Sequence, residues 1–62
     1  NISADEEALL QILQAGTPLA SSELAHKAGY SKAKTLRLLT HLIEENYVKG
    51  LGNGRGKKYT IA

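Results

Sequence analysis

A chain of 62 residues without a single cysteine has few ways to hold itself folded. A domain of this size buries only about 60% of the surface that its unfolded chain exposes. Without cysteine, neither a disulfide nor a thiolate-bound metal can stabilise the fold. The core must therefore come from leucine, isoleucine, valine and alanine packed between short elements. We expect one domain over residues 1–62, and because it begins with Asn1 rather than methionine we expect it to be excised from a longer protein.

The charged residues are distributed unevenly along the chain. Its first part carries three acids and no base, a net charge of −3. From Ser22 onward eight basic residues face three acids, a net charge of +5. An asymmetric charge of this kind attracts a polyanion to one side of a molecule. No apolar run approaches the roughly 20 residues of a membrane span, and no signal peptide is recognisable. We therefore expect a cytoplasmic, nucleoid-associated, helix-rich module.

The first helix is predicted by the stretch SADE. Ser3 can accept a hydrogen bond from the backbone N–H of Glu6, whose carboxylate can accept one from the backbone of Ser3 in return. Apolar residues at helical spacing follow. Gly16 is expected to end this helix, and residues 19–20 to form a brief extended piece with a single bridge.

A helix-turn-helix pattern comes next. A second short helix is expected to be capped by Ser21 or Ser22 and to end at Gly29. Ser31 is expected to cap a third helix over residues 32–46. Two helices joined by so short a glycine-containing turn are typical of the helix-turn-helix motif.

The third helix and the residues after it complete a recognisable order of elements. The third helix is predicted to bury a stripe formed by Thr35, Leu38, Leu39 and Leu42. The segments YVKG (47–50) and KKYTI (57–61) then have strand character on either side of LGNGRG, which predicts a hairpin with a glycine-rich tip. The expected fold is a small α+β winged helix, in which a three-helix bundle with a helix-turn-helix precedes a two-stranded wing.

The sequence resembles the winged helix-turn-helix DNA-binding superfamily of bacterial and archaeal regulators. The segment GYSKAKTLRLLTHLIEENYV is similar to the recognition-helix segment of IclR-like and MarR-like repressors. The matching positions are Gly29, Ser31, Arg37, Leu39, Leu42, Glu44, Glu45, Tyr47 and Val48. The tail GNGRGKKYTI is similar to the wing of RecG-related regulators. Leu36 departs from the pattern, because these families usually place a polar, groove-facing side chain there.

The resemblance implies binding of double-stranded DNA within a transcriptional regulator or a DNA-processing protein. The third helix, about residues 32–45, would enter the major groove, and the wing, residues 50–58, would lie on the backbone or in the minor groove. The candidate DNA contacts are Ser31, Lys32, Lys34, Thr35, Arg37, His41, Arg55, Lys57 and Lys58.

Structural alternatives stay open for several of these residues. Ser31 could act only as a helix cap, and Arg37 could pair with a carboxylate such as Glu44 or with an acid of the second helix. His41 is more typical of a solvated or backbone-contacting residue than of a ligand. The basic residues of the wing could serve only to keep an edge strand from aggregating. Leu36 could contact a thymine methyl if it is exposed, and is otherwise expected to pack under the wing.

Other classes of function differ in how much support the sequence offers. A winged helix can also dock a protein, and an apolar Leu36 on the reading face favours that alternative. RNA binding through shape and backbone contacts is a second alternative. Enzymatic activity has no support, because there is no cysteine nucleophile and no histidine pair at metal spacing. GNGRGK lacks the spacing of a phosphate-binding loop. We expect no cofactor and no bound metal.

Overall fold

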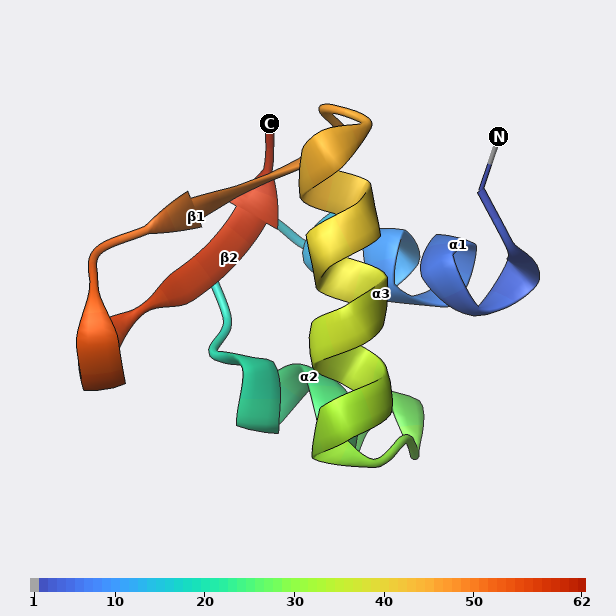
Figure 1. Cartoon of the computed structure of the whole chain (residues 1–62), viewed down its shortest axis with the longest axis horizontal. Helices are drawn as coiled ribbons and strands as arrows, with labels where there is room; N and C mark the ends of the chain where they lie inside the picture. The colour runs from blue at the N-terminus through green and yellow to red at the C-terminus, as the bar shows by residue number, and fades with distance from the viewer. Residues whose placement is uncertain (1) are drawn as a thin grey trace.

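The computed structural model describes residues 2–62 and, at Arg55, the backbone alone. The elements in chain order are α1 (Ala4–Leu13), α2 (Ser21–Ala28), α3 (Lys32–Glu44), β1 (Val48–Leu51), the 3₁₀ turn η1 (Gly54–Gly56) and β2 (Lys58–Ile61). The predicted fold class is confirmed, since three helices precede a two-stranded antiparallel hairpin (Figure 1). Within the described residues, no helix combines the length and the apolar character needed to cross a membrane.

The start of α1 has the predicted reciprocal cap. The backbone N–H of Glu6 donates to Ser3 Oγ at 3.2 Å, and the backbone N–H of Ser3 donates to Glu6 Oε1 at 2.7 Å. These two bonds satisfy N–H groups that have no partner within a helix. The helix ends at Leu13, and Gly16 follows with a φ of 96°.

The start of α2 differs from the prediction. Neither Ser21 nor Ser22 caps this helix, because both already lie inside its first turn, and Ala20 occupies the capping position. The carboxylate of Glu23 accepts a hydrogen bond from the backbone N–H of Ala20 at 2.9 Å. The two serine hydroxyls are therefore not needed to cap the helix. Gly29 ends α2 in the left-handed conformation, as expected, with a φ of 77°.

The third helix begins where predicted and ends two residues before the predicted end at residue 46. The backbone N–H of Lys34 donates to Ser31 Oγ at 3.1 Å, which confirms Ser31 as the cap. The last helical residue is Glu44, and Asn46 takes the left-handed conformation with a φ of 65°. Asparagine tolerates this conformation better than most residues, so the chain can turn into β1 without a glycine.

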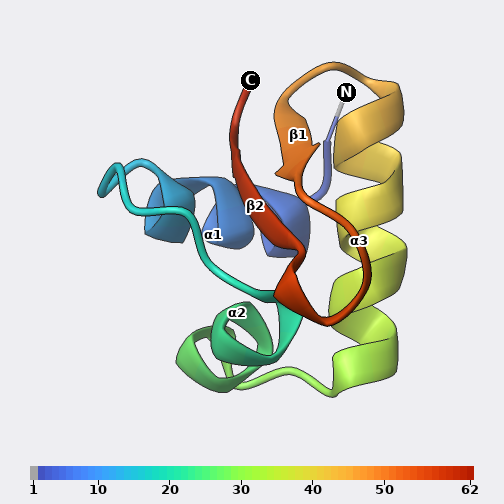
Figure 2. The ribbon, with the colours of Figure 1, turned by 90° about the vertical axis from the view of Figure 1, so that its left-hand side faces the viewer.

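The hairpin is attached to the helices through one extra bridge. Val48 pairs with Ile61 and Leu51 with Lys58 across the two strands. Leu19 pairs with Tyr59 through backbone hydrogen bonds of 3.0 and 2.8 Å, which confirms the predicted single bridge. The turn η1 at the tip was not predicted. Figure 2 shows the wing in front, with α2 below it and α3 to the right.

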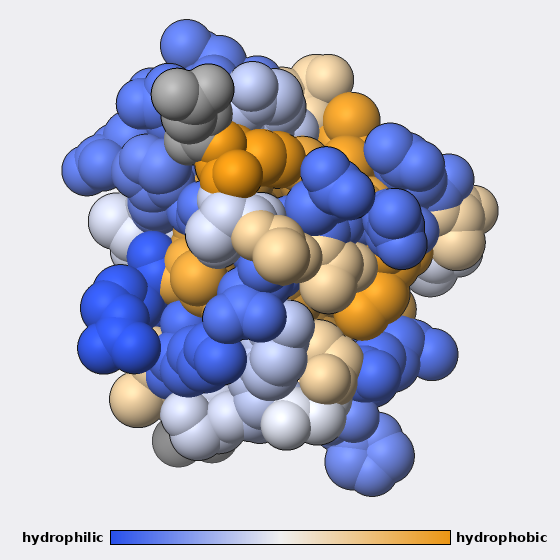
Figure 3. Space-filling model, turned by 90° about the vertical axis from the view of Figure 1, so that its right-hand side faces the viewer, coloured by the Kyte–Doolittle hydropathy of each residue, from blue (hydrophilic) through white to orange (hydrophobic). Residues whose placement is uncertain are grey.

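The core gathers apolar side chains from all three helices and both strands. Its buried members are Leu9, Leu10, Leu13, Leu24, Leu39, Leu42, Val48 and Tyr59. Leu38, predicted to be buried, is only partly so. On the face seen in Figure 3, apolar surface emerges in separate patches between polar side chains. This is expected of a small domain, which cannot cover its core completely.

Candidate nucleic-acid interface

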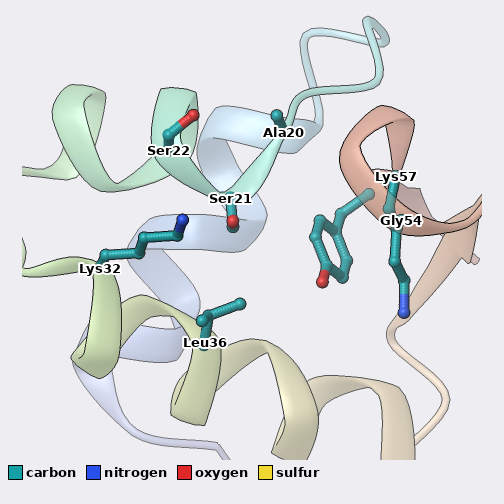
Figure 4. Close-up of a pocket in the computed structure, with 8 residues that line it drawn as sticks. Ala20, Ser21, Ser22, Lys32, Leu36, Gly54 and Lys57 are labelled. Atoms are coloured by element: carbon teal, nitrogen blue, oxygen red, sulfur yellow. The ribbon is translucent and has the colours of Figure 1, made fainter.

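The N-terminus of α2, the first half of α3 and the wing surround a groove, which we call the α3–wing groove. Its volume is about 320 Å³. Its lining consists of Ala20, Ser21, Ser22, Lys32, Leu36, Gly54, Lys57 and Tyr59. Figure 4 shows Lys32 and Leu36 extending from α3 into this space, with Lys57 on the wing side. The groove thus brings together three segments that are far apart in the sequence.

Two lysines stand on opposite sides of the α3–wing groove. Lys32 and Lys57 are both exposed, and neither forms an ion pair with any other residue that the structure describes. The side chain of Lys57 crosses the hairpin over Gly50, where a Cβ would lie only 2.7 Å from Lys57 Cε. Its ammonium lies 5.4 Å from the centre of the Tyr59 ring. Glycine at position 50 therefore leaves room for a cation on this face of the wing.

Arg37 lies on the exposed face of α3, and Ser31 lies directly before the first turn of this helix. Arg37 is exposed and makes no ion pair with another described residue, so the alternative pairing with Glu44 does not form. The Ser31 hydroxyl caps the helix, and its backbone carbonyl accepts a hydrogen bond from Thr35 Oγ1 at 2.9 Å. Arg37 therefore keeps its five N–H donors available for a ligand.

Lys34 lies on the other flank of α3, against α1. Its ammonium is 2.9 Å from Asp5 Oδ2 and 4.4 Å from the centre of the Tyr30 ring. The Tyr30 hydroxyl donates to Asp5 Oδ1 at 2.9 Å. Two hydrogen bonds lower the pKa of Asp5. The one from Lys34 has the larger effect, and the one from Tyr30 the smaller. Lys34 thus joins the start of α1 to the helix-turn-helix, which gives it a structural reason to be basic.

His41 also faces α1, where it meets a buried carboxylate. Glu6 is only 5% exposed, and its Oε2 pairs with Nδ1 of His41. Burial alone would raise the pKa of Glu6, but hydrogen bonds from the Ser3 backbone and from His41 together lower it. The hydrogen bond with Glu6 raises the pKa of His41. The contact replaces the solvated or backbone-contacting role expected for His41, and it fixes α3 against the capped end of α1.

The His41–Glu6 pair is expected to make the domain more stable near pH 6 than near pH 8. Because the folded-state pKa of His41 lies above its ordinary value of 6.5, its contribution is fully present below about pH 6.5 and is lost as pH rises through the raised value. The pKa of Glu6 is lowered from 4.5, so its contribution is lost only as pH falls through the lowered value. The pair therefore stabilises the fold most at pH values between the lowered pKa of Glu6 and the raised pKa of His41.

Thermal unfolding at about pH 6 and about pH 8 measures this effect. The midpoint of the natural domain should fall with rising pH, and that of His41→Gln should change less, because glutamine can still donate to Glu6 but does not titrate. The same fall in both proteins would assign the pH dependence to other groups.

The sequence family is decided by a match that covers most of the chain. Residues 8–52 match the model of the IclR helix-turn-helix domain. The chain belongs to this family. It is a DNA-binding winged helix-turn-helix domain of the type found in transcriptional regulators. No curated protein matches the sequence significantly.

Solved structures agree with this assignment at the level of the fold. RV1404 from Mycobacterium tuberculosis superimposes on the IclR-type domain with a TM-score of 0.93 at 22% identity, covering 100% of this chain and 44% of that one. The Zalpha domain of PKZ from Carassius auratus, solved in complex with Z-DNA, has a TM-score of 0.85 at 21% identity, covering 97% of this chain and 100% of that one. The Helicobacter pylori ferric uptake regulator Fur has a TM-score of 0.83 at 28% identity, and the match covers 100% of this chain and 46% of Fur. The IclR-type domain thus spans under half the length of RV1404 and of Fur.

Three further candidate contacts have different surroundings. Thr35 is fully buried and donates its hydroxyl to Ser31, so the prediction that it contacts DNA is corrected. Lys58 of the wing forms an exposed ion pair with Glu23 of α2, in which Lys58 Nζ lies 3.8 Å from Glu23 Oε1. The side chain of Arg55 lies outside the described residues, so this candidate stays a prediction.

The structure also adds residues to the interface that the sequence reasoning missed. Ser21 and Ser22 line the α3–wing groove, although they were expected only to cap α2. Leu36 lines the same groove and is 38% exposed, so of its two predicted alternatives the exposed one applies and packing under the wing does not. The available signal for this part of the interface was the pair of serines that directly follows the extended residue Ala20. In the part of the chain that the structure describes, no group of three acidic, histidine or cysteine residues could hold a metal, whereas Fur is described as having three metal sites.

Proposed function

We propose that this domain binds double-stranded DNA with the N-terminal half of α3 in the major groove and with the wing, residues 50–58, on the flanking backbone or in the minor groove. The proposed contacts are Ser31, Lys32, Arg37, Arg55, Lys57 and Lys58, together with Ser21 and Ser22. The parent protein would be a transcriptional regulator. Lys34, Thr35 and His41 are left out, because each already has a partner on the side of α1 or in the core.

The observation that carries the proposal is the α3–wing groove with its two lysines. Lys32 and Lys57 come from different elements and line one space, which Ser21 and Ser22 also line. Cations and hydroxyls are the groups that contact phosphates in DNA complexes. Arg37 on the adjacent exposed face has the fork geometry that reads the edge of guanine. The charges are therefore arranged for a polyanion that lies across α3 and the wing.

The direct test is a titration of the labelled domain with random-sequence duplex DNA at low and at raised salt, followed through backbone amide shifts. Shifts should cluster at residues 31–37 and 52–58, and affinity should fall steeply with salt, because each neutralised phosphate releases counterions. A left-handed duplex should be included as a competitor, since the similar Zalpha domain was solved with Z-DNA. Absence of any shift at low salt would reject the proposal.

Lys32 and Lys34 provide a matched pair of variants for the same assay. Lys32→Ala should weaken binding and reduce the slope of log affinity against log salt by about 0.9, the value for one lost phosphate contact. Lys34→Ala removes the same charge from the flank that faces Asp5, so it should leave that slope unchanged. A larger effect from Lys34→Ala would place the DNA on the α1 flank instead.

Docking of a protein is the second candidate, and exposed apolar residues favour it. Leu36, Tyr47 and Leu51 are 38%, 41% and 40% exposed. A complex with a protein would depend little on salt, whereas a complex with DNA would depend on it strongly. The salt dependence of the titration therefore separates the two functions.

A further inference from the structure

The exposed face of α3 has an unusual composition for a surface that reads bases. Ala33, Leu36, Arg37 and Thr40 are all exposed, and their spacing of three and four residues places them side by side on the helix. Among these four only Arg37 is charged. The Thr40 hydroxyl donates to the backbone carbonyl of Leu36 at 2.9 Å, so its proton is already used within the helix. Beside the donors of Arg37, the face therefore offers the apolar side chains of Ala33 and Leu36.

An apolar side chain can be matched by only one feature of the major groove. The base edges there present hydrogen-bond donors and acceptors, and thymine adds a methyl group at C5. A leucine pressed against donors or acceptors would remove their water without replacing the hydrogen bonds, which is unfavourable. Against a methyl group, the same leucine buries apolar surface, which is favourable.

The position of Leu36 relative to the cations makes this contact geometrically direct. Lys32 precedes it by one helical turn, and Lys57 lies on the wing side of the α3–wing groove (Figure 4). Phosphates bound by these two lysines would hold a duplex over the groove. Leu36 would then lie between the backbone contacts, at the level of the bases.

We propose that Leu36 reads the C5 methyl group of a pyrimidine in the major groove, so that the domain prefers thymine, or 5-methylcytosine, at the position beneath it. This proposal rests on the proposed function, because it requires α3 to lie in the major groove. It specifies the chemistry of the preferred ligand, a 5-methylated pyrimidine, which DNA binding alone does not.

The test compares duplexes that differ only in this methyl group. An alternating adenine–thymine duplex and the same duplex with deoxyuracil in place of thymine have the same charge and base pairing. The natural domain should bind the thymine duplex about three- to fivefold more tightly, the effect of burying one methyl group. A second pair, a guanine–cytosine duplex with and without 5-methylcytosine, should show a preference in the same direction.

Two variants separate methyl recognition from other effects of the substitution on the duplex. Leu36→Ala should bind the thymine and uracil duplexes with nearly equal affinity, close to that of the natural domain for uracil. Lys32→Ala should weaken binding to both duplexes and keep their ratio. An unchanged ratio in Leu36→Ala, or equal binding of both duplexes by the natural domain, overturns the methyl proposal even if salt-dependent binding persists. If no duplex is bound at low salt, the proposed function fails as well.

Discussion

Replacement of Leu39 by alanine is expected to remove most of the stability of this domain. Leu39 is 1% exposed and belongs to the core formed by the helices and both strands. Large-to-small substitutions at such sites cost about 2–5 kcal/mol, because the removed atoms leave a cavity that the surroundings only partly fill. A domain of 62 residues has a total free energy of unfolding of about 3–9 kcal/mol. The loss is therefore comparable with the whole.

Thermal unfolding followed by circular dichroism measures this loss. At about 4–8 °C per kcal/mol for a domain of this size, the midpoint should fall by about 10–40 °C. Leu36→Ala makes the same chemical change on the same helix at an exposed position, so it should cost less than about 0.5 kcal/mol. Equal losses in the two variants would mean that Leu39 is not packed in the core.

The fold could be predicted from the sequence because its boundaries are specified locally. The cap of α1 needs only Ser3 and Glu6, three residues apart, and both hydrogen bonds form as expected. Gly29 and Asn46 mark the helix ends through their tolerance of a positive φ. The α2 cap failed because Ala20, Ser21 and Ser22 offer several starting points within one turn. The side chain of Glu23, which accepts from Ala20, decides between them.

The interface was harder to predict because it depends on partners distant in the sequence. The helical periodicity places Lys34 and His41 where exposed side chains could contact bases. Asp5 and Glu6 instead hold these two side chains against α1. Those pairs span 29 and 35 positions, and helical periodicity does not reveal which element covers a given flank. Likewise, the serines of α2 join the α3–wing groove only because the bridge between Leu19 and Tyr59 holds the wing beside them.

Arg37→Glu is expected to weaken binding of duplex DNA by about 10- to 100-fold at low salt. Arg37 is exposed on α3 and lacks an ion-pair partner in the described part of the chain, so its full charge is available to the duplex. The substitution removes the arginine fork of α3 and places an anion against base edges and phosphates. A good bidentate contact is worth about 1–3 kcal/mol, and repulsion adds to that loss.

Lys27→Glu is the matched control for this reversal of charge. Lys27 lies in the last turn of α2, at the opposite end of that helix from Ser21 and Ser22. Lys27→Glu changes the net charge by the same two units as Arg37→Glu. It should therefore weaken binding only through the overall electrostatic field of the protein, which salt screens. Affinities measured by fluorescence anisotropy at two salt concentrations compare the variants. A similar loss in both would mean that binding follows net charge, and α3 would then not be the element that enters the groove.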